Sequence, residues 1–213
     1  MDFRQFEKQI VKIRKMELPG QEVQFKMAPI ARLHEMRATS KRVQEAKKAG
    51  VMALFYPTVD NQTNLILILR KTYHGVHSAQ VGFPGGKLEP EDKSFQDAAL
   101  RETEEEIGVP RKNIEVLRGL SEIYIPPSNF FVRPFVGITT TTPQFVAEEK
   151  EVEELIEVDL QHFLDNRCII TDTLTTSYAT KLVVPAYRLN GYVVWGATAM
   201  MLSEVREMLL KIL

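Results

Sequence analysis

Two short apolar runs dominate the hydrophobic pattern in the first half of the chain. Residues 51–56 and 65–69 are almost wholly aliphatic or aromatic, and the polar turn formers of residues 60–62 separate them. Continuous apolar runs of this length indicate strands that are buried on both faces. We therefore expect a hairpin of two central strands, and the apolar run at residues 130–138 predicts a further strand.

A helix is predicted over Phe95–Ile107 from its two ends and its apolar stripe. Ser94, with Asp97 three residues later, has the spacing of a capping box, and Gly108 is the residue type that most easily takes the left-handed conformation after a helix. At about 100° per residue, the mostly apolar positions share one stripe that should face a core. These positions are Phe95, Ala99, Leu100, Thr103 and Ile107.

Further helices are expected near the two ends of the chain. Apolar residues recur at helical spacing over residues 3–13, and a second stripe of this kind covers residues 200–213. We expect the first of these helices to lie outside the core of the main domain. Residues 21–49 are basic and polar, and the tract over residues 44–48 has a helical composition.

Charge and cysteine content exclude several classes of protein. The chain has 27 lysines and arginines against 28 aspartates and glutamates, a net charge of -1, so no global basic field attracts nucleic acid. The single Cys168 excludes an intramolecular disulfide and fits a reducing compartment. The sequence has no apolar run of signal-peptide length near its start and no 18-residue apolar span. We expect a soluble cytoplasmic protein with neither a nucleic-acid nor a membrane partner.

Carboxylates gather in the last turns of the helix that begins with the capping box. Glu102, Glu105 and Glu106 can converge at one margin of its apolar stripe, whereas Glu104 points away. The helix macrodipole is negative at this end, so each carboxylate is unfavourable by roughly 0.3–1 kcal/mol. Arg101 can pair with Glu105, but one cation cannot neutralise the whole set. One interpretation is a solvated acidic face; the sharper one is a site for Mg²⁺ or Mn²⁺, which suit oxygen ligands of this kind.

The residues around these carboxylates resemble the Nudix box of enzymes that hydrolyse nucleoside diphosphates linked to another moiety. Asp92 stands where the box has glutamate, Thr103 stands where it has an aliphatic residue, and one extra residue lies between Asp92 and Arg101. The insertion lies upstream of the metal-binding turn, so the spacing of the ligands is intact. The matching positions are Gly86, Arg101, Glu102, Glu105, Glu106, Gly108 and Val109.

The segment before the box is similar to a signature of the coenzyme A diphosphatase group of Nudix enzymes. Ala79 stands where a glycine is usual, and residues 74–75 stand where many members have Leu-Arg. The phrase at residues 195–199 is also similar, and the resemblance spans residues 50–210. The matching positions of the signature are Arg70, His77, Gln80, Phe83, Pro84, Gly85 and Gly86.

The resemblance implies a fold and a division of the chain. The expected fold is the α/β Nudix sandwich of three layers, α/β/α, with a mixed, curved β-sheet between helices and with added N-terminal and C-terminal helices. We divide the chain into an N-terminal helical and basic extension, residues 1–48, and a Nudix hydrolase domain, residues 49–213. The N-terminal helix could be a contact in a homodimer.

The implied chemistry is hydrolysis of a pyrophosphate link with Mg²⁺ or Mn²⁺. Arg101 would orient Glu105, and a carboxylate of the box or of Glu149 or Glu151 would take the proton from water. Of the cations near the box, Arg70 and Lys71 are the candidates for binding a further phosphate group of the substrate. The expected metal ligands are Gly86, Glu102, Glu105 and Glu106, and the expected substrate-binding residues are Arg70, Lys71, His77, Gln80 and Phe83.

Several functions compete for these residues. The resemblance favours coenzyme A or an acyl derivative, split into 3′,5′-ADP and 4′-phosphopantetheine. The nearest alternative is a Nudix enzyme acting on ADP-ribose, a dinucleoside polyphosphate or an oxidised nucleotide. A Nudix fold used as a nucleotide-sensing or protein-binding module is an alternative of another class. A nucleic-acid-binding protein with a basic arm at residues 26–48 would show strongly salt-dependent binding to any oligonucleotide.

Overall fold

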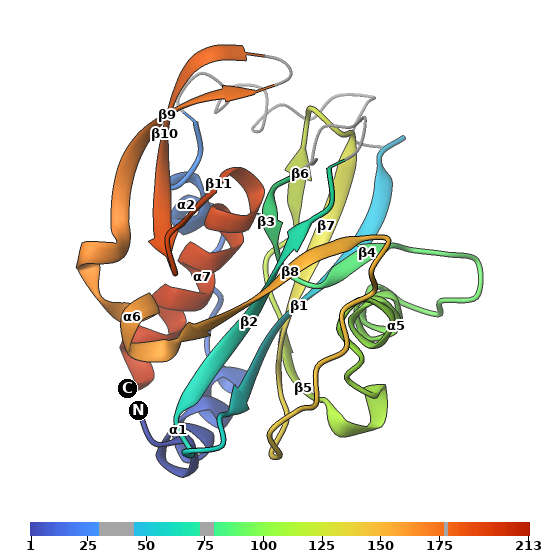
Figure 1. Cartoon of the computed structure of the whole chain (residues 1–213), viewed down its shortest axis with the longest axis vertical. Helices are drawn as coiled ribbons and strands as arrows, with labels where there is room; N and C mark the ends of the chain where they lie inside the picture. Colours follow the sequence, from blue (N-terminus) through green and yellow to red (C-terminus); the bar gives the residue numbers. More distant parts are fainter. Residues whose placement is uncertain (30–44, 73–78, 177–178) are drawn as a thin grey trace.

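The computed structural model of the chain describes residues 1–29, 45–72, 79–176 and 179–213. Helices cover both faces of a curved, mixed β-sheet, which confirms the expected three-layer α/β fold with N-terminal and C-terminal helices (Figure 1). The described helices are α1 (Phe3–Ile10), α2 (Gln21–Phe25), α5 (Phe95–Ile107), α6 (Leu160–Leu164) and α7 (Gly196–Ile212), and short 3₁₀ helices span Val11–Lys15, Arg111–Asn113 and Asn166–Cys168.

The larger sheet contains one parallel pair among antiparallel ones. Its strands are β1 (Lys47–Pro57), β2 (Thr63–Arg70), β3 (Val81–Gly82), β4 (Gly85–Lys87), β5 (Glu115–Gly119), β6 (Ile123–Ile125), β7 (Phe130–Ile138) and β8 (Val152–Asp159). They follow the order β3-β2-β1-β7-β5, with β4 beside β1, β6 beside β7 and β8 beside β2. β1 and β7 are parallel, and β1 and β2 form the antiparallel hairpin that the two apolar runs predict.

A smaller sheet of the described residues stands beside α7. It has the order β11-β10-β9, and its strands are β9 (Ile169–Thr176), β10 (Ala179–Leu189) and β11 (Tyr192–Trp195). The chain passes directly from β11 into α7, because Gly196 starts the helix where Trp195 ends the strand. This connection brings the first turn of α7 to the larger sheet, where the side chain of Thr198 donates a hydrogen bond to the carbonyl of Val81 at 2.9 Å.

Alternate residues of β1 pack in two different cores. Val51 and Phe55 belong to the core that also holds residues of α1 and α7, whereas Met52 and Leu54 belong to the core under α5. All four side chains are at most 9% exposed. The continuous apolar run of β1 therefore follows from burial on both faces, as a strand between two helical layers requires.

The N-terminal helix is part of the main core. Phe6 is fully buried, and its ring centroid lies 5.2 Å from that of Phe55 on β1. The expectation that this helix lies outside the core is wrong, because its apolar stripe covers the sheet face beside α7 and is buried there with Phe3, Ile10 and Ile13. The division of the chain at residue 48 stays a prediction.

The described end of the basic tract is a strand, which corrects the helix expected over residues 44–48. The backbone N–H of Lys47 donates to the carbonyl of Asn129 at 2.9 Å, and Lys47 pairs with Phe130 on β7. This conformation depends on pairing with a strand some eighty positions away in the sequence. The local sequence pattern gives no information about that pairing. Among the described helices, none combines the length and apolar character needed to cross a membrane.

Candidate active site

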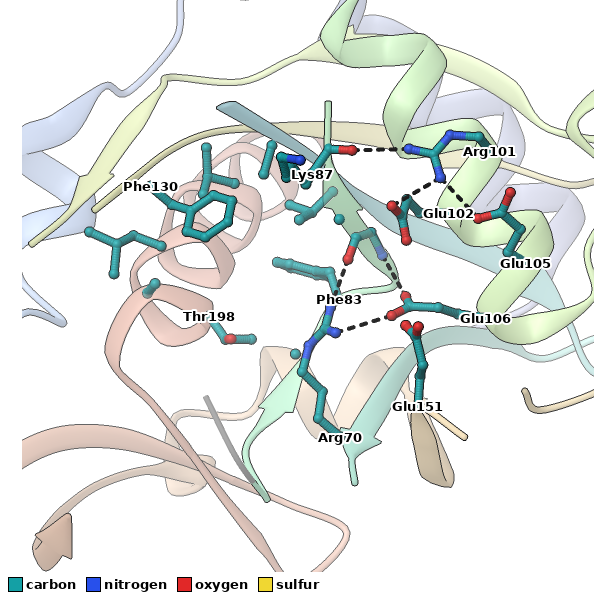
Figure 2. Close-up of a pocket in the computed structure, with 18 of the residues that line it drawn as sticks. Arg70, Phe83, Lys87, Arg101, Glu102, Glu105, Glu106, Phe130, Glu151 and Thr198 are labelled. Atoms are coloured by element: carbon teal, nitrogen blue, oxygen red, sulfur yellow. Dashed lines mark hydrogen bonds and ion pairs between the residues drawn. The ribbon is translucent and has the colours of Figure 1, made fainter. Parts of the chain in front are cut away.

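A pocket of about 730 Å³ lies where the end of α5, the strands β1, β4 and β7, and the first turns of α7 meet. Figure 2 shows its two sides: glutamates gather on one, and Phe130 and Thr198 lie on the other. Arg70 enters between them from the end of β2. The pocket is thus lined by residues from distant parts of the sequence, with the acidic helix at one end.

Three carboxylates meet on the acidic side. Oxygens of Glu102, Glu106 and Glu151 all lie within 4.8 Å of one another, and we call this group the carboxylate cluster. Glu102 and Glu106 are one helical turn apart on α5, so the spacing of the sequence brings them together as expected. Glu105 lines the same pocket, but its carboxylate pairs with Arg101 at 2.9 Å and is 55% exposed.

Backbone hydrogen bonds to the end of α5 position Glu151. The N–H groups of Val146 and Glu148 donate to the carbonyls of Ile107 and Glu106, both at 3.0 Å. The last carbonyls of a helix lack partners within the helix, so this loop satisfies two of them while it approaches the cluster. The carbonyl of Glu151 in turn accepts from the N–H of Lys71 at 2.9 Å. The loop and the end of β2 together hold Glu151 beside the helix.

Glu106 is the most deeply buried member of the cluster. Its side chain is 2% exposed, and it accepts a hydrogen bond from the N–H of Gly85 at 2.7 Å. Burial raises its pKa to about 7, although Arg70 and the Gly85 N–H oppose the shift. Its Oε1 lies 3.2 Å from Nη1 of Arg70 but accepts no hydrogen bond from any described residue. A buried carboxylate oxygen of this kind is costly unless something positive binds it.

The cluster fits a hard divalent cation. It offers carboxylate oxygens from three residues, and burial also raises the pKa of Glu102, with Arg101 opposing the shift. A bound cation would offset the repulsion among the carboxylates and would give Oε1 of Glu106, which has an ion pair with Arg70 but no hydrogen bond from a described residue, a second positive partner. Oxygen donors in this arrangement suit Mg²⁺ or Mn²⁺ better than softer metals.

Gly86 leaves room for one of these carboxylates. A Cβ atom at position 86 would lie 2.4 Å from the carboxylate carbon of Glu102. The absence of a side chain therefore lets the strand β4 approach α5 at the level of the cluster. The use of the Gly86 carbonyl as a metal ligand stays a prediction.

Arg101 connects the loop before α5 to the glutamates on it. It donates to Glu102 at 3.0 Å, to Glu105 at 2.9 Å and to the carbonyl of Lys87 at 3.0 Å. It also donates to both carboxylate oxygens of Asp92, at 3.1 Å and 2.9 Å, and these bonds hold the pKa of Asp92 below its usual value. The aspartate therefore makes the arginine contact from the position where the Nudix box has glutamate.

The other expected site residues are distributed unevenly. Arg70 and Phe83 line the pocket. Lys71 instead pairs with Glu153 at 3.4 Å, and neither Lys71 nor Glu149 is among the described lining residues. Gln80 also lies outside the described lining, and His77 lies outside the described residues. The roles expected for all these side chains stay predictions.

One side of the pocket is not predicted by the motifs of the sequence. Six apolar side chains line it, and we call them the apolar wall: Ala49, Val51, Ile125, Phe130, Val132 and Met201. Three of them, Ala49, Val51 and Val132, are buried residues of strands, so their pattern predicts a core position and carries no sign of a pocket. The weak signal was the helical stripe beginning near Met201, which indicates a packed helix but not which side of it meets a ligand.

The family model described as the NUDIX domain matches residues 48–168, which include the pocket-lining parts of β1, β4, α5 and β7. The chain belongs to the NUDIX domain family. The Yersinia pestis protein called uncharacterized Nudix hydrolase NudL is 28% identical to it over 176 residues, which are 82% of either chain. The protein is therefore a Nudix hydrolase, an enzyme that acts on phosphoric anhydrides, and its Nudix box supplies Glu102 and Glu106 of the carboxylate cluster.

Solved structures of Nudix proteins share the fold of this hydrolase. The Nudix hydrolase RenU of M. smegmatis has a TM-score of 0.55 at 15% identity, over 79% of this chain and 88% of that one. A MutT/nudix family protein from Enterococcus faecalis has a TM-score of 0.53 at 16% identity, over 92% of this chain and 76% of that one. At these identities the likeness concerns the fold.

Proposed function

We propose that this Nudix hydrolase cleaves the pyrophosphate bond of coenzyme A or an acyl-CoA, giving 3′,5′-ADP and 4′-phosphopantetheine or its acyl derivative. The observation that carries the proposal is the junction of the carboxylate cluster and the apolar wall in one pocket. The coenzyme A signature over Arg70 to Gly86 supports the same substrate.

The chemistry of coenzyme A matches that junction. Beyond the pyrophosphate, its pantetheine arm begins with a methylene group and then a carbon that carries two methyl groups. An apolar group therefore lies beside the charged bond, and burying it against aliphatic side chains is favourable. In ADP-ribose the same place is taken by a ribose with free hydroxyl groups, which lose hydrogen bonds to water against an apolar surface.

The side chains of the pocket have separate tasks in this proposal. Glu102, Glu105, Glu106 and the Gly86 carbonyl are the proposed ligands of Mg²⁺ or Mn²⁺. A divalent cation, when bound, neutralises charge on the pyrophosphate and activates water near neutral pH. Arg101 holds Glu102 and Glu105 in place through its hydrogen bonds.

The general base and the phosphate contacts complete the proposal. The general base is a carboxylate of the box, Glu149 or Glu151, and Glu151 is better placed than Glu149, because its carboxylate belongs to the cluster whereas Glu149 does not line the described pocket. Arg70 faces the pocket beside Glu106, a position from which its guanidinium can meet a phosphate oxygen of the substrate. Lys71, His77, Gln80 and Phe83 are the further proposed substrate contacts.

Two alternatives are kept for the test. Hydrolysis of ADP-ribose or a dinucleoside polyphosphate uses the same carboxylates and differs in the group that meets the apolar wall. A non-catalytic binding module is not favoured, since such a module has no need for the full set of box acids.

We place the reaction in the cytoplasm, because a free buried Cys168 fits a reducing compartment. Homodimer formation stays a prediction.

The test compares kcat/KM for coenzyme A, ADP-ribose and diadenosine polyphosphates, each with Mg²⁺, Mn²⁺ or EDTA, with identification of the products. We expect metal-dependent release of 3′,5′-ADP and the highest kcat/KM for coenzyme A or an acyl-CoA, with loss of this activity in Glu105→Gln. Faster cleavage of another substrate would keep the reaction class and overturn the substrate. Binding of nucleotides without any turnover would favour the binding module.

A further inference from the structure

Strand register puts the sheet part of the apolar wall on one face. Ala49 of β1 lies opposite Lys87 on β4 and opposite Val132 on β7. Phe130, two residues before Val132, lies opposite Ile125 on β6. Because side chains alternate along a strand, residues two apart point to the same side, so these residues form one continuous surface.

The first turns of α7 line the same part of the pocket. Ala197, Thr198 and Met201 line the same pocket as the sheet surface. Met201 and Ala49 belong to one core cluster, and both also line the pocket. We use the word slot for this part of the pocket, between the strand residues of the apolar wall and the first turns of α7.

Ala49 is the smallest side chain in its row. Its neighbours across the strands are Lys87 and Val132, and a longer side chain at position 49 would extend from the centre of the row into the slot. Ala49 is 5% exposed and yet lines the pocket, so its methyl group forms part of the floor. Lys87 directs its ammonium group to Glu89 at 3.3 Å, at the exposed edge of the row.

We infer that the slot binds the pantetheine arm of the substrate and that Ala49 is the residue that determines whether this arm fits. This inference rests on the proposed function, since it assigns one half of coenzyme A to one half of the pocket. The dimethyl carbon of the arm lies against the floor formed by Ala49 and Val51, next to the carboxylate cluster. The 3′,5′-ADP half lies outside the slot.

The two products of the reaction separate these halves experimentally. Calorimetric titration in Mg²⁺ measures the Kd of 4′-phosphopantetheine and of 3′,5′-ADP for the wild type and for Ala49→Leu. We expect Ala49→Leu to weaken 4′-phosphopantetheine by roughly tenfold to a hundredfold, the range that a few methylene groups decide in an apolar pocket. The Kd of 3′,5′-ADP should stay within about twofold, which also shows that the variant is folded.

Two further variants serve as a control and as a replacement in this experiment. Val59→Leu adds a methylene group at a side chain that is 91% exposed and outside the pocket, and it should change neither Kd. Phe130→Ala removes a half-buried ring at the rim of the slot and replaces Ala49→Leu if that variant does not fold. It should also weaken 4′-phosphopantetheine and spare 3′,5′-ADP.

The outcomes are separable from a failure of the proposed function. Weaker binding of 3′,5′-ADP with unchanged 4′-phosphopantetheine would put the adenylate in the slot and overturn the inference. Unchanged binding of both products, in an enzyme that does hydrolyse coenzyme A, would also overturn it. A wild type that neither hydrolyses coenzyme A nor binds 4′-phosphopantetheine would overturn the proposed function itself.

Discussion

Arg70 and Glu106 lie 3.2 Å apart, and their ion pair joins the end of β2 to the last turn of α5. The same guanidinium donates to the carbonyl of Gly85 at 2.6 Å. Arg70 therefore neutralises part of the carboxylate cluster and positions the first residue of β4. The guanidinium already has two protein partners. A phosphate of the substrate that binds to it would either replace Glu106 or share the guanidinium with it.

Glu106→Gln should remove most of the activity on the best substrate. The substitution keeps the shape of the side chain but deletes the charge of the most buried carboxylate in the cluster, so it weakens the proposed metal site. We expect kcat to fall by roughly a hundredfold or more at saturating Mg²⁺. Glu104→Gln is the matched control, since Glu104 is on the same helix and pairs with Arg111 at 2.8 Å away from the cluster. An equal loss in both variants would contradict the assignment.

Glu151→Gln and Glu149→Gln separate the two candidates for the general base that lie outside the Nudix box. Glu151 belongs to the carboxylate cluster, whereas Glu149 is exposed and outside the described lining. Loss of a general base typically lowers kcat by 10²–10⁴-fold, and we expect about this effect for Glu151→Gln. A larger loss in Glu149→Gln would move the base to that residue.

Asp92→Asn should destabilise the protein near neutral pH by about 2 kcal/mol, because Arg101 then lacks its buried charged partner. The pKa of Asp92 is lowered in the folded state, so its stabilising effect is complete above the unfolded pKa, near 3.8. The effect is lost as the pH falls through the folded pKa. Denaturant unfolding at pH 7 and at steps below pH 3.8 should show the difference between the two proteins becoming smaller as the pH falls. A difference that is independent of pH would contradict an ionic contribution.

Gly108→Ala tests how the end of α5 holds the loop that carries Glu151. Gly108 has φ +73°, and a Cβ there would lie 3.0 Å from Cβ of Val146. Gly191→Ala is the control, because Gly191 has φ +87° but open space around the added methyl group. Each substitution should cost about 1–2 kcal/mol for the left-handed backbone.

The two glycine variants should differ in activity. Gly108→Ala also displaces Val146, so it should lower kcat as well as the midpoint of thermal unfolding, whereas Gly191→Ala should lower the midpoint alone. Equal kcat values in the two variants would show that the loop does not depend on this contact.

Local signals were enough to predict the acidic helix and the central strands. Ser94 accepts from the N–H of Asp97, and Gly108 takes the left-handed conformation, so the ends of α5 are where the capping residues predict them. Glu102 and Glu106 lie close together because residues four apart on a helix are neighbours, which the spacing in the sequence already shows. The apolar runs of β1 and β2 also predict a buried hairpin from local pattern, because strands that are covered on both faces need continuous apolar residues.

The rest depends on contacts between distant segments. Glu151 joins the cluster through backbone bonds from its loop to the end of α5, and an acidic run in the sequence does not distinguish it from Glu149. Ala49 has the pattern of a core residue, and only its register against β4 and β7 gives it a place in the pocket. The burial of Phe6 against Phe55 likewise joins segments that are far apart in the sequence.

The most direct test of the account is the release of 3′,5′-ADP from coenzyme A by the purified protein. We predict steady release in Mg²⁺, no release in EDTA and recovery when Mg²⁺ is restored in excess. Absence of 3′,5′-ADP in Mg²⁺ and in Mn²⁺, from a protein that hydrolyses ADP-ribose under the same conditions, would contradict the substrate and leave the carboxylate cluster with another pyrophosphate to cleave.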